Sequence, residues 1–113
     1  MIGRMRWQHP IRRVVISGPS MLPTLQPGEW WLARSGTPRI GDIVLLRDPE
    51  LLERWLVKRI IRRSGTGWWV TGDNAEASRD SRDFGPVERE LIFGPLWWRY
   101  RPRLRRHVFD WRA

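Results

Sequence analysis

Short apolar runs, broken repeatedly by glycine and proline, are the main pattern along this chain. The runs are rich in β-branched and aromatic residues and occupy residues 12–16, 29–34, 43–47, 54–63, 68–71 and 87–93. No long stretch has the 3.6-residue period of an amphipathic helix. A short helical turn is expected at residues 51–53, and residues 75–84 are expected to form a polar loop or a short helix. The pattern therefore predicts a mostly β protein, a compact antiparallel β-sheet domain of about six strands with sheets folded on one another.

The length of 113 residues is enough for one domain with a core of modest size. We expect an N-terminal arm at residues 1–11, a core at 12–95 and a basic tail at 96–113. No apolar run reaches the roughly 18 residues of a membrane span, and the N-terminus lacks the apolar centre of a signal peptide. These features predict a cytoplasmic protein without a transmembrane segment, at most peripheral to a membrane. Cysteine is absent, which excludes disulfides and a thiol nucleophile.

The net charge of +9 is compatible with a nucleic acid, an anionic membrane or an acidic partner. Six of the nine tryptophans form the adjacent pairs Trp30-Trp31, Trp68-Trp69 and Trp97-Trp98. Neighbours in a strand face opposite sides, so each pair is expected to place one indole in the core and one outside. Outward indoles beside arginines are typical of a membrane interface or a peptide groove, and a small sheet covered on both faces explains them equally well.

Residues 17–25 follow the first predicted strand and are rich in glycine and proline. Gly18, Pro19 and Pro23 exclude regular structure, so the chain must leave the sheet along a fixed, bent path. Ser20 lies on this bend, and a rigid turn at a strand end can hold one hydroxyl still in front of a cleft. A turn that carries an incidental serine explains this stretch equally well.

Lys58 is the single lysine among 21 basic residues. Alternation along the predicted strand places it on the same face as Leu56 and Ile60. Apolar surroundings lower a lysine pKa from about 10.4, whereas an arginine keeps its charge. We interpret Lys58 as an amine that can lose its proton. The alternative is a leftover lysine in an arginine-biased chain, with its head reaching water.

Residues 72–87 form a long polar segment. Asp80 and Arg82 are spaced to form a bidentate pair that pins this loop, and Ser78 or Ser81 can hydrogen-bond a buried partner. Taken alone, a solvated surface loop is the simpler interpretation.

Together, four segments resemble the type I signal peptidase family of Ser/Lys endopeptidases. They are residues 17–25, 41–44, 57–60 and 72–87, and the resemblance extends from about residue 14 to residue 93. It implies the β fold of signal peptidases and self-cleaving repressors, and peptide-bond hydrolysis with no metal or other cofactor. It also implies a role for each of five residues. Ser20 would be the nucleophile and Lys58 the general base, Ser78 would orient the lysine, and Asp80 and Arg82 would form a structural ion pair.

Two departures from the family point to a branch of it. The chain shows no membrane-spanning N-terminal segment and no large inserted domain, which resembles the compact nickel-type superoxide dismutase maturation proteases. That likeness implies a precursor polypeptide as substrate, above all the precursor of nickel-type superoxide dismutase, from which an N-terminal extension is removed. Some relatives carry a serine at the position of Gly18 as a second oxyanion donor, and glycine removes that donor here.

Three other functions are considered. A general signal peptidase acting on secreted precursors is the alternative within the family, with tryptophans and arginines docked on anionic lipid. A self-cleaving repressor needs a DNA-binding domain, for which the 19 residues before Ser20 are too few. A nucleic-acid-binding β domain accounts for the basic charge and aromatics but not for Lys58, so nucleic acid is not the expected partner. His9 and His107 lie near the chain ends, which argues against a histidine-based triad.

Overall fold

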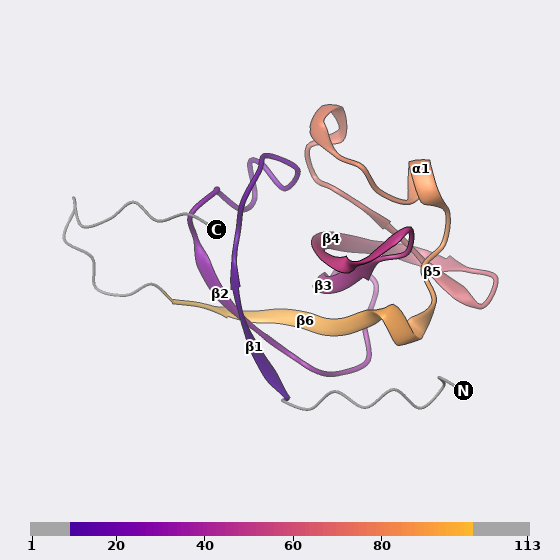
Figure 1. The fold of residues 1–113 in the computed structure, drawn as a ribbon, viewed down its shortest axis with the longest axis horizontal. Helices are drawn as coiled ribbons and strands as arrows, with labels where there is room; N and C mark the ends of the chain where they lie inside the picture. The colour runs from indigo at the N-terminus through magenta and orange to yellow at the C-terminus, as the bar shows by residue number, and fades with distance from the viewer. Residues whose placement is uncertain (1–9, 101–113) are drawn as a thin grey trace.

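Strand β6 (Ile92–Arg99) joins the two halves of the sheet, because it pairs with two different strands along its length. The computed structural model describes residues 10–100. The other strands are β1 (Ile11–Val15), β2 (Trp30–Arg34), β3 (Ile43–Asp48), β4 (Leu51–Ser64) and β5 (Gly67–Thr71). The order across the sheet is β1-β2-β6-β3-β4-β5, with every neighbouring pair antiparallel (Figure 1). The prediction of a mostly β, antiparallel domain is confirmed.

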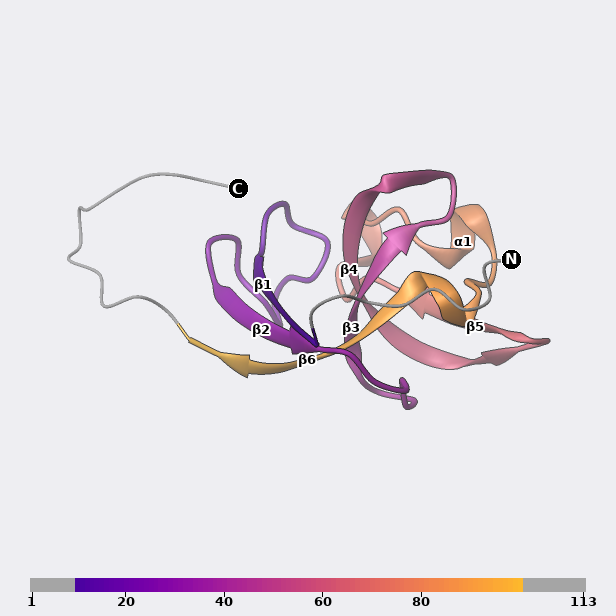
Figure 2. The ribbon, with the colours of Figure 1, turned by 60° about the horizontal axis from the view of Figure 1, so that its bottom comes forward.

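Gly94 lies where β6 passes from one partner strand to the other. Its φ of +155° is one that other residues rarely adopt, and a side chain there would collide with the carbonyl oxygen of Arg34. The start of β6 pairs with β3, and its end pairs with β2. The sheet therefore folds over itself, with β1 and β2 on one side and β4 and β5 on the other (Figure 2).

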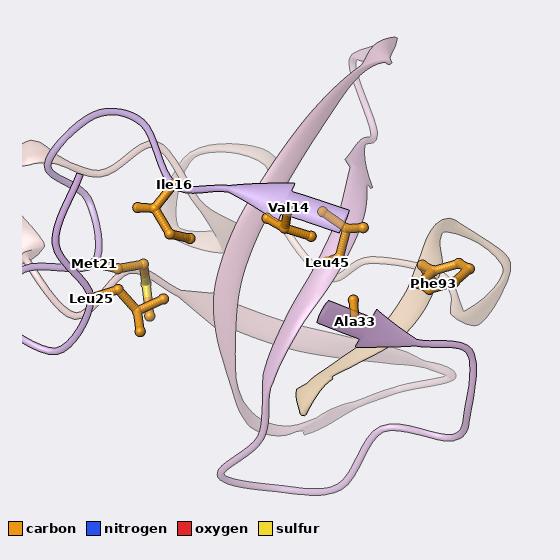
Figure 3. Packing of buried hydrophobic residues seen from close by; sticks show 7 residues of the cluster. All are labelled: Val14, Ile16, Met21, Leu25, Ala33, Leu45 and Phe93. Carbon is orange, nitrogen blue, oxygen red and sulfur yellow. The ribbon is translucent and has the colours of Figure 1, made fainter. Parts of the chain in front are cut away.

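Two buried clusters lie on opposite faces of β3. The first consists of Val14, Ile16, Met21, Leu25, Ala33, Leu45 and Phe93 (Figure 3). The second consists of Val44, Leu46, Ile60, Trp68, Val70, Val87 and Ile92. Strand β3 contributes Leu45 to the first cluster and Leu46 to the second, because successive residues face opposite sides of a sheet. Burial on both faces explains why β3 is a continuous apolar run in the sequence.

Several predicted boundaries differ from the structure. Residues 51–53 are not helical, because β4 starts at Leu51 and pairs with Asp48 of β3 in a hairpin. The last strand starts at Ile92 rather than at residue 87, after a 3-10 turn, η3 (Arg89–Leu91). Residues 96–99 belong to β6 instead of the predicted tail. The rest of that tail, residues 101–113, and residues 1–9 of the predicted arm lie outside the described part of the chain.

Two short helical segments follow β5. They are η2 (Ala75–Ala77) and α1 (Ser81–Phe84), and α1 packs against β5. The side chain of Asp80 accepts a hydrogen bond from the N–H of Arg82, which starts α1 with a capping box. In Figure 1, the loop between β5 and α1 lies on the same side of the molecule as the loop between β1 and β2. These two loops carry most of the predicted site residues.

Candidate active site

The loop after β1 holds Ser20 through anchors on both sides. The side chains of Met21 and Leu25 are buried in the first core cluster, where Figure 3 shows them close together. The backbone N–H of Asn74 donates to the Ser20 carbonyl oxygen at 2.8 Å, and the Asn74 side-chain amide donates to the carbonyl of Pro19 at 3.0 Å. The bend that carries Ser20 is therefore attached both to the core and to the loop after β5.

Asp73 and Gly72 strengthen this attachment. The Asp73 carboxylate accepts a hydrogen bond from the hydroxyl of Thr24 at 2.6 Å, and it pairs with both ends of the Arg59 guanidinium at 2.9 and 2.8 Å. The hydrogen bond with Arg59 lowers the pKa of Asp73, which keeps it ionised. At Gly72, an added Cβ would lie 2.7 Å from the Ser20 carbonyl oxygen, so only glycine allows the two loops to come this close.

Lys58 lies on β4 with its side chain almost fully buried, at 3% exposure. It shares a face with the half-buried Leu56 and the buried Ile60, as strand alternation predicted. Its Nζ donates a hydrogen bond to Ser78 Oγ at 3.1 Å. Burial lowers the pKa of Lys58, and nearby arginines lower it further, while the negative charge of Asp80 opposes them. The amine is thus poised to lose its proton more readily than a lysine in water.

Ser78 connects the amine to a buried carboxylate. Its hydroxyl donates to Asp80 Oδ2 at 2.7 Å, so an oxygen lone pair is left to accept from Lys58. Asp80 also accepts from the N–H of Gly72 at 2.8 Å and forms an ion pair with Arg82 at 2.7 Å. Burial by itself raises the pKa of Asp80, but the Arg82 side chain and the backbone N–H groups hold that pKa well below its usual range. Asp80 is therefore a fixed anion that orients the Ser78 hydroxyl.

A cleft of about 370 Å³ is lined by both Ser20 and Lys58. Its walls come from the end of β1, the loop after it, and the first half of β4. Ser78 lies between two further lining residues, Ala77 and Arg79. An amine with a lowered pKa can accept a proton from a hydroxyl in the same cleft. The structure thus brings together the five residues that the sequence singled out. Ser20 lies on the loop after β1, Lys58 on β4, Ser78 and Asp80 on the loop after β5, and Arg82 in α1.

Sequence reasoning missed the interactions of Arg79. Its guanidinium pairs with the fully buried Asp48 at the end of β3 and with Glu50 at 2.6 Å. This contact ties the turn between β3 and β4 to the loop that carries Ser78. Asp48 and Arg79 are 31 residues apart, so no local pattern in the sequence indicates that they meet. Asp73 and Asn74 were part of a recognised segment, but their attachment to the Ser20 loop was not foreseen.

Comparison with known proteins identifies the family. The family described as "Signal peptidase, peptidase S26" matches residues 2–67, a match that ends before the loop carrying Ser78. A mitochondrial ATP-independent inner membrane protease subunit 1a from Arabidopsis thaliana is 37% identical, over 76% of this chain and 71% of that protein. Mitochondrial inner membrane protease subunit 1 from Mus musculus is 32% identical, over 79% and 69%. Subunit 2 from Bos taurus is 31% identical, over 68% and 59%.

These similarities and the fold define a protease of the signal-peptidase type, which acts on precursor polypeptides. The chain belongs to the signal peptidase S26 family. None of these three relatives is a nickel-type superoxide dismutase maturation protease, so the comparisons support the family rather than that branch.

The expected cytoplasmic location is wrong. The relatives are proteases of the mitochondrial inner membrane, which points to association with a membrane instead. Within residues 10–100, no helix is long and apolar enough to cross a bilayer. The expectation rested on the lack of an apolar run long enough to span a bilayer. A protein can also associate with a membrane surface without such a run.

Proposed function

We propose that this chain is a serine endopeptidase in which Ser20 is the nucleophile and Lys58 is the general base. The observation that carries the proposal is a buried amine that shares a cleft with Ser20 and is tethered to Ser78. The neutral amine takes the Ser20 proton as Oγ attacks the peptide carbonyl, and it passes that proton to the departing amine. The same amine then activates the water that hydrolyses the acyl-enzyme.

Ser78, Asp80 and Arg82 act in this proposal as positioning residues. Ser78 holds the lysine amine by one hydrogen bond, and Asp80 directs the Ser78 hydroxyl so that it accepts from the amine. An uncompensated carboxylate so close to Lys58 would favour the ammonium form. The ion pair with Arg82 offsets that charge, which supports a lysine that is neutral when the reaction starts.

The oxyanion requires hydrogen-bond donors that point at the developing charge. The backbone N–H of Ser20 is the donor we propose, since Pro19 has none. Gly18 has a φ of +80°, a conformation that a serine would adopt only with strain. A serine at this position, which some relatives carry as a second oxyanion donor, would therefore be strained in this chain.

The proposed substrate is a precursor protein with an N-terminal extension. The first candidate is the precursor of nickel-type superoxide dismutase, because residues 17–25 resemble the nucleophile segment of that compact branch. The second is a precursor processed at a membrane, which the named relatives from mitochondrial inner membranes favour. The two candidates share the same chemistry and differ only in the polypeptide that enters the cleft.

The test is cleavage of both precursors by the purified full chain, with new N-termini located by mass spectrometry. We expect Ser20→Ala and Lys58→Arg to abolish cleavage, because the second variant keeps a charge but cannot supply a neutral base. Arg62→Lys, an exposed change on the same strand, is the matched control and should cleave normally. Full activity of Lys58→Arg would remove the lysine from the mechanism. Cleavage of the second precursor alone would overturn the dismutase assignment and leave the protease intact.

A further inference from the structure

Arg54 lines the cleft and has no partner within the protein. It lies on β4, four residues before Lys58, and it is exposed. Among the residues that the structure describes, it forms no hydrogen bond and no ion pair. Alternation along the strand places Arg54, Leu56 and Lys58 on one face of β4. A free cation therefore lies on the same wall of the cleft as the proposed general base.

The part of β4 that carries Arg54 is open along one edge. Strand β3 pairs with the other edge from Leu51 to Arg59, whereas β5 pairs with β4 only from Arg59 onward. Within residues 10–100, no strand covers the open edge beside Arg54. A peptide in the cleft can therefore approach this guanidinium without displacing any part of the sheet.

The second arginine in the cleft wall, Arg79, is already neutralised. It pairs with Asp48 and, at 2.6 Å, with Glu50. The Asp48 carboxylate also accepts from the N–H of Glu50, and it attracts Arg54 without forming an ion pair with it. None of the described residues that line the cleft is acidic. The charge of Arg54 is therefore left for an anion that enters the cleft.

Most of the other side chains in the cleft wall are apolar, among them Val14, Ile16, Leu45 and Val57. An apolar surface offers no hydrogen bond to a carboxylate, so a buried acidic side chain would be favoured only beside an arginine. A basic side chain at the same place would be repelled by the like charge of Arg54. The cleft can thus discriminate both by attraction and by repulsion.

The position of Arg54 along the strand sets which part of a peptide it meets. Strand residues rise by about 3.3 Å each, so the backbones of Arg54 and Lys58 are separated by about 13 Å. A peptide extended along the cleft has the same rise per residue. Arg54 would therefore contact a side chain about four residues from the scissile bond, too far away to take part in the reaction itself.

We propose that Arg54 selects precursors that carry aspartate or glutamate about four residues from the cleavage site. This inference rests on the proposed protease function and names the class of polypeptide that the cleft prefers. A guanidinium can pair with a carboxylate through two parallel hydrogen bonds, which fixes the position of the acidic residue as well as its charge. Arg54 is a specificity-determining residue in this proposal and has no part in proton transfer.

Arg34 provides a matched control outside the cleft. It is exposed at the end of β2, and its guanidinium lies 5.4 Å from the ring centre of Trp97. Trp97 and Trp98 are 46% and 56% exposed, which corrects the expectation that each tryptophan pair would place one indole in the core. A register shift between Leu32 and Ala33, where β2 pairs with β6, accompanies this exposure. Replacing Arg34 removes the same charge as replacing Arg54 but leaves the cleft wall intact.

The test measures binding of short labelled peptides to the full chain carrying Ser20→Ala, by fluorescence anisotropy. The peptides span the processing sites of the two candidate precursors, with aspartate or asparagine placed at one position at a time. We expect aspartate to bind about three- to tenfold more tightly at one position, about four residues from the cut, and less so as salt is added. Arg54→Gln should abolish this preference, Arg54→Lys should keep part of it, and Arg54→Glu should transfer it to lysine peptides. Arg34→Gln should leave it unchanged, and circular dichroism verifies that each variant is folded.

Cleavage by the chain with Ser20 intact is measured in parallel. The kcat/KM ratio of aspartate to asparagine peptides should follow the binding preference. Burial is the main cause of the lowered pKa of Lys58 and the charge of Arg54 adds to it, but this influence acts on both peptides and cancels in the ratio. If no peptide is cleaved while the Arg54-dependent binding preference is present, the protease function fails and the carboxylate site stands.

Three results would overturn the proposal. One is equal affinity for aspartate and asparagine peptides at every position. Another is a preference for aspartate that persists in Arg54→Gln. The third is a preference that Arg34→Gln removes as completely as Arg54→Gln does, because it would then reflect the net charge of the protein and not a site in the cleft.

Discussion

Replacing Lys58 with methionine tests whether the buried amine has a lowered pKa. Methionine is unbranched and apolar, so it suits the space that the lysine stem occupies. An unfolded chain keeps the lysine proton up to a pH of about 10.4. In the folded protein burial lowers that pKa, so between the two values only the unfolded chain binds the proton. The stability of the wild-type protein therefore gains a contribution that rises with pH in this interval, and the methionine variant lacks it.

The size of this effect follows from proton linkage. The free energy of unfolding changes by about 1.4 kcal/mol per pH unit while the folded and unfolded states differ by one bound proton. At a pH below the pKa of Lys58 in the folded protein, the buried amine is charged, and its burial lowers the stability of the wild-type protein. The hydrogen bond to Ser78 and the attraction of Asp80 offset part of this loss. We expect Lys58→Met to be the more stable protein at a pH of about 6, with the difference narrowing toward a pH of about 10.

The assay is urea unfolding of both proteins, followed by tryptophan fluorescence, at a series of pH values. Other titrating groups are present in both proteins, so their contributions cancel when the two free energies of unfolding are subtracted. The remaining pH dependence comes from Lys58. Lys58→Arg is the second variant. Its free energy of unfolding should fall further below that of the wild-type protein as the pH rises, because arginine stays charged. If the difference between Lys58→Met and wild type is the same at every pH, the amine has an ordinary pKa and the argument for a neutral base fails.

Three further predictions concern the support of the site. Ser78→Ala removes the acceptor for the Lys58 amine, and we expect kcat for precursor cleavage to fall about ten- to a hundredfold with the far-ultraviolet circular dichroism unchanged. Gly72→Ala forces a Cβ against the loop of Ser20, so thermal unfolding should show a loss of about 1–3 kcal/mol, together with lost cleavage. Arg79→Met removes the guanidinium from the buried Asp48 and should cost about 1–3 kcal/mol in urea at neutral pH, whereas Glu50→Gln should cost less.

Each of these predictions has a result that would contradict it. An unchanged kcat in Ser78→Ala would mean that the lysine amine needs no tether. Wild-type stability in Gly72→Ala would mean that the two loops can separate freely. Equal losses in Arg79→Met and Glu50→Gln would mean that the buried carboxylate of Asp48 does not depend on its guanidinium partner. Burial by itself raises the pKa of Asp48, but the backbone N–H of Glu50 and the Arg79 side chain together hold that pKa below its usual value. The stabilisation that Arg79 gives should therefore decline as the pH falls through that lowered value.

Much of the fold follows from local patterns. The alternation of side chains predicted the buried position of Lys58 between Leu56 and Ile60 on β4. The apolar run at residues 43–47 marked the strand β3, which is buried on both faces. Such patterns depend on the geometry of a few consecutive residues, which is the same in any sheet. The presence of each strand was therefore predicted more accurately than the residues at which it begins and ends. Those residues depend on how β3 pairs with β4 and how β6 pairs with β2.

The sequence alone determined where the chain bends rigidly and which residues on each strand share a face. Steric limits on glycine and proline place Ser20 on such a bend, and they act within a few residues. Only the tertiary structure decided which bends meet. The contact between Asn74 and Pro19 joins residues 55 positions apart, and it exists because β6 lies between β2 and β3 and brings the two halves of the sheet over each other. The ion pair of Arg79 with Asp48 and the exposure of both Trp97 and Trp98 arise in the same way, from strand order and register that no short segment specifies.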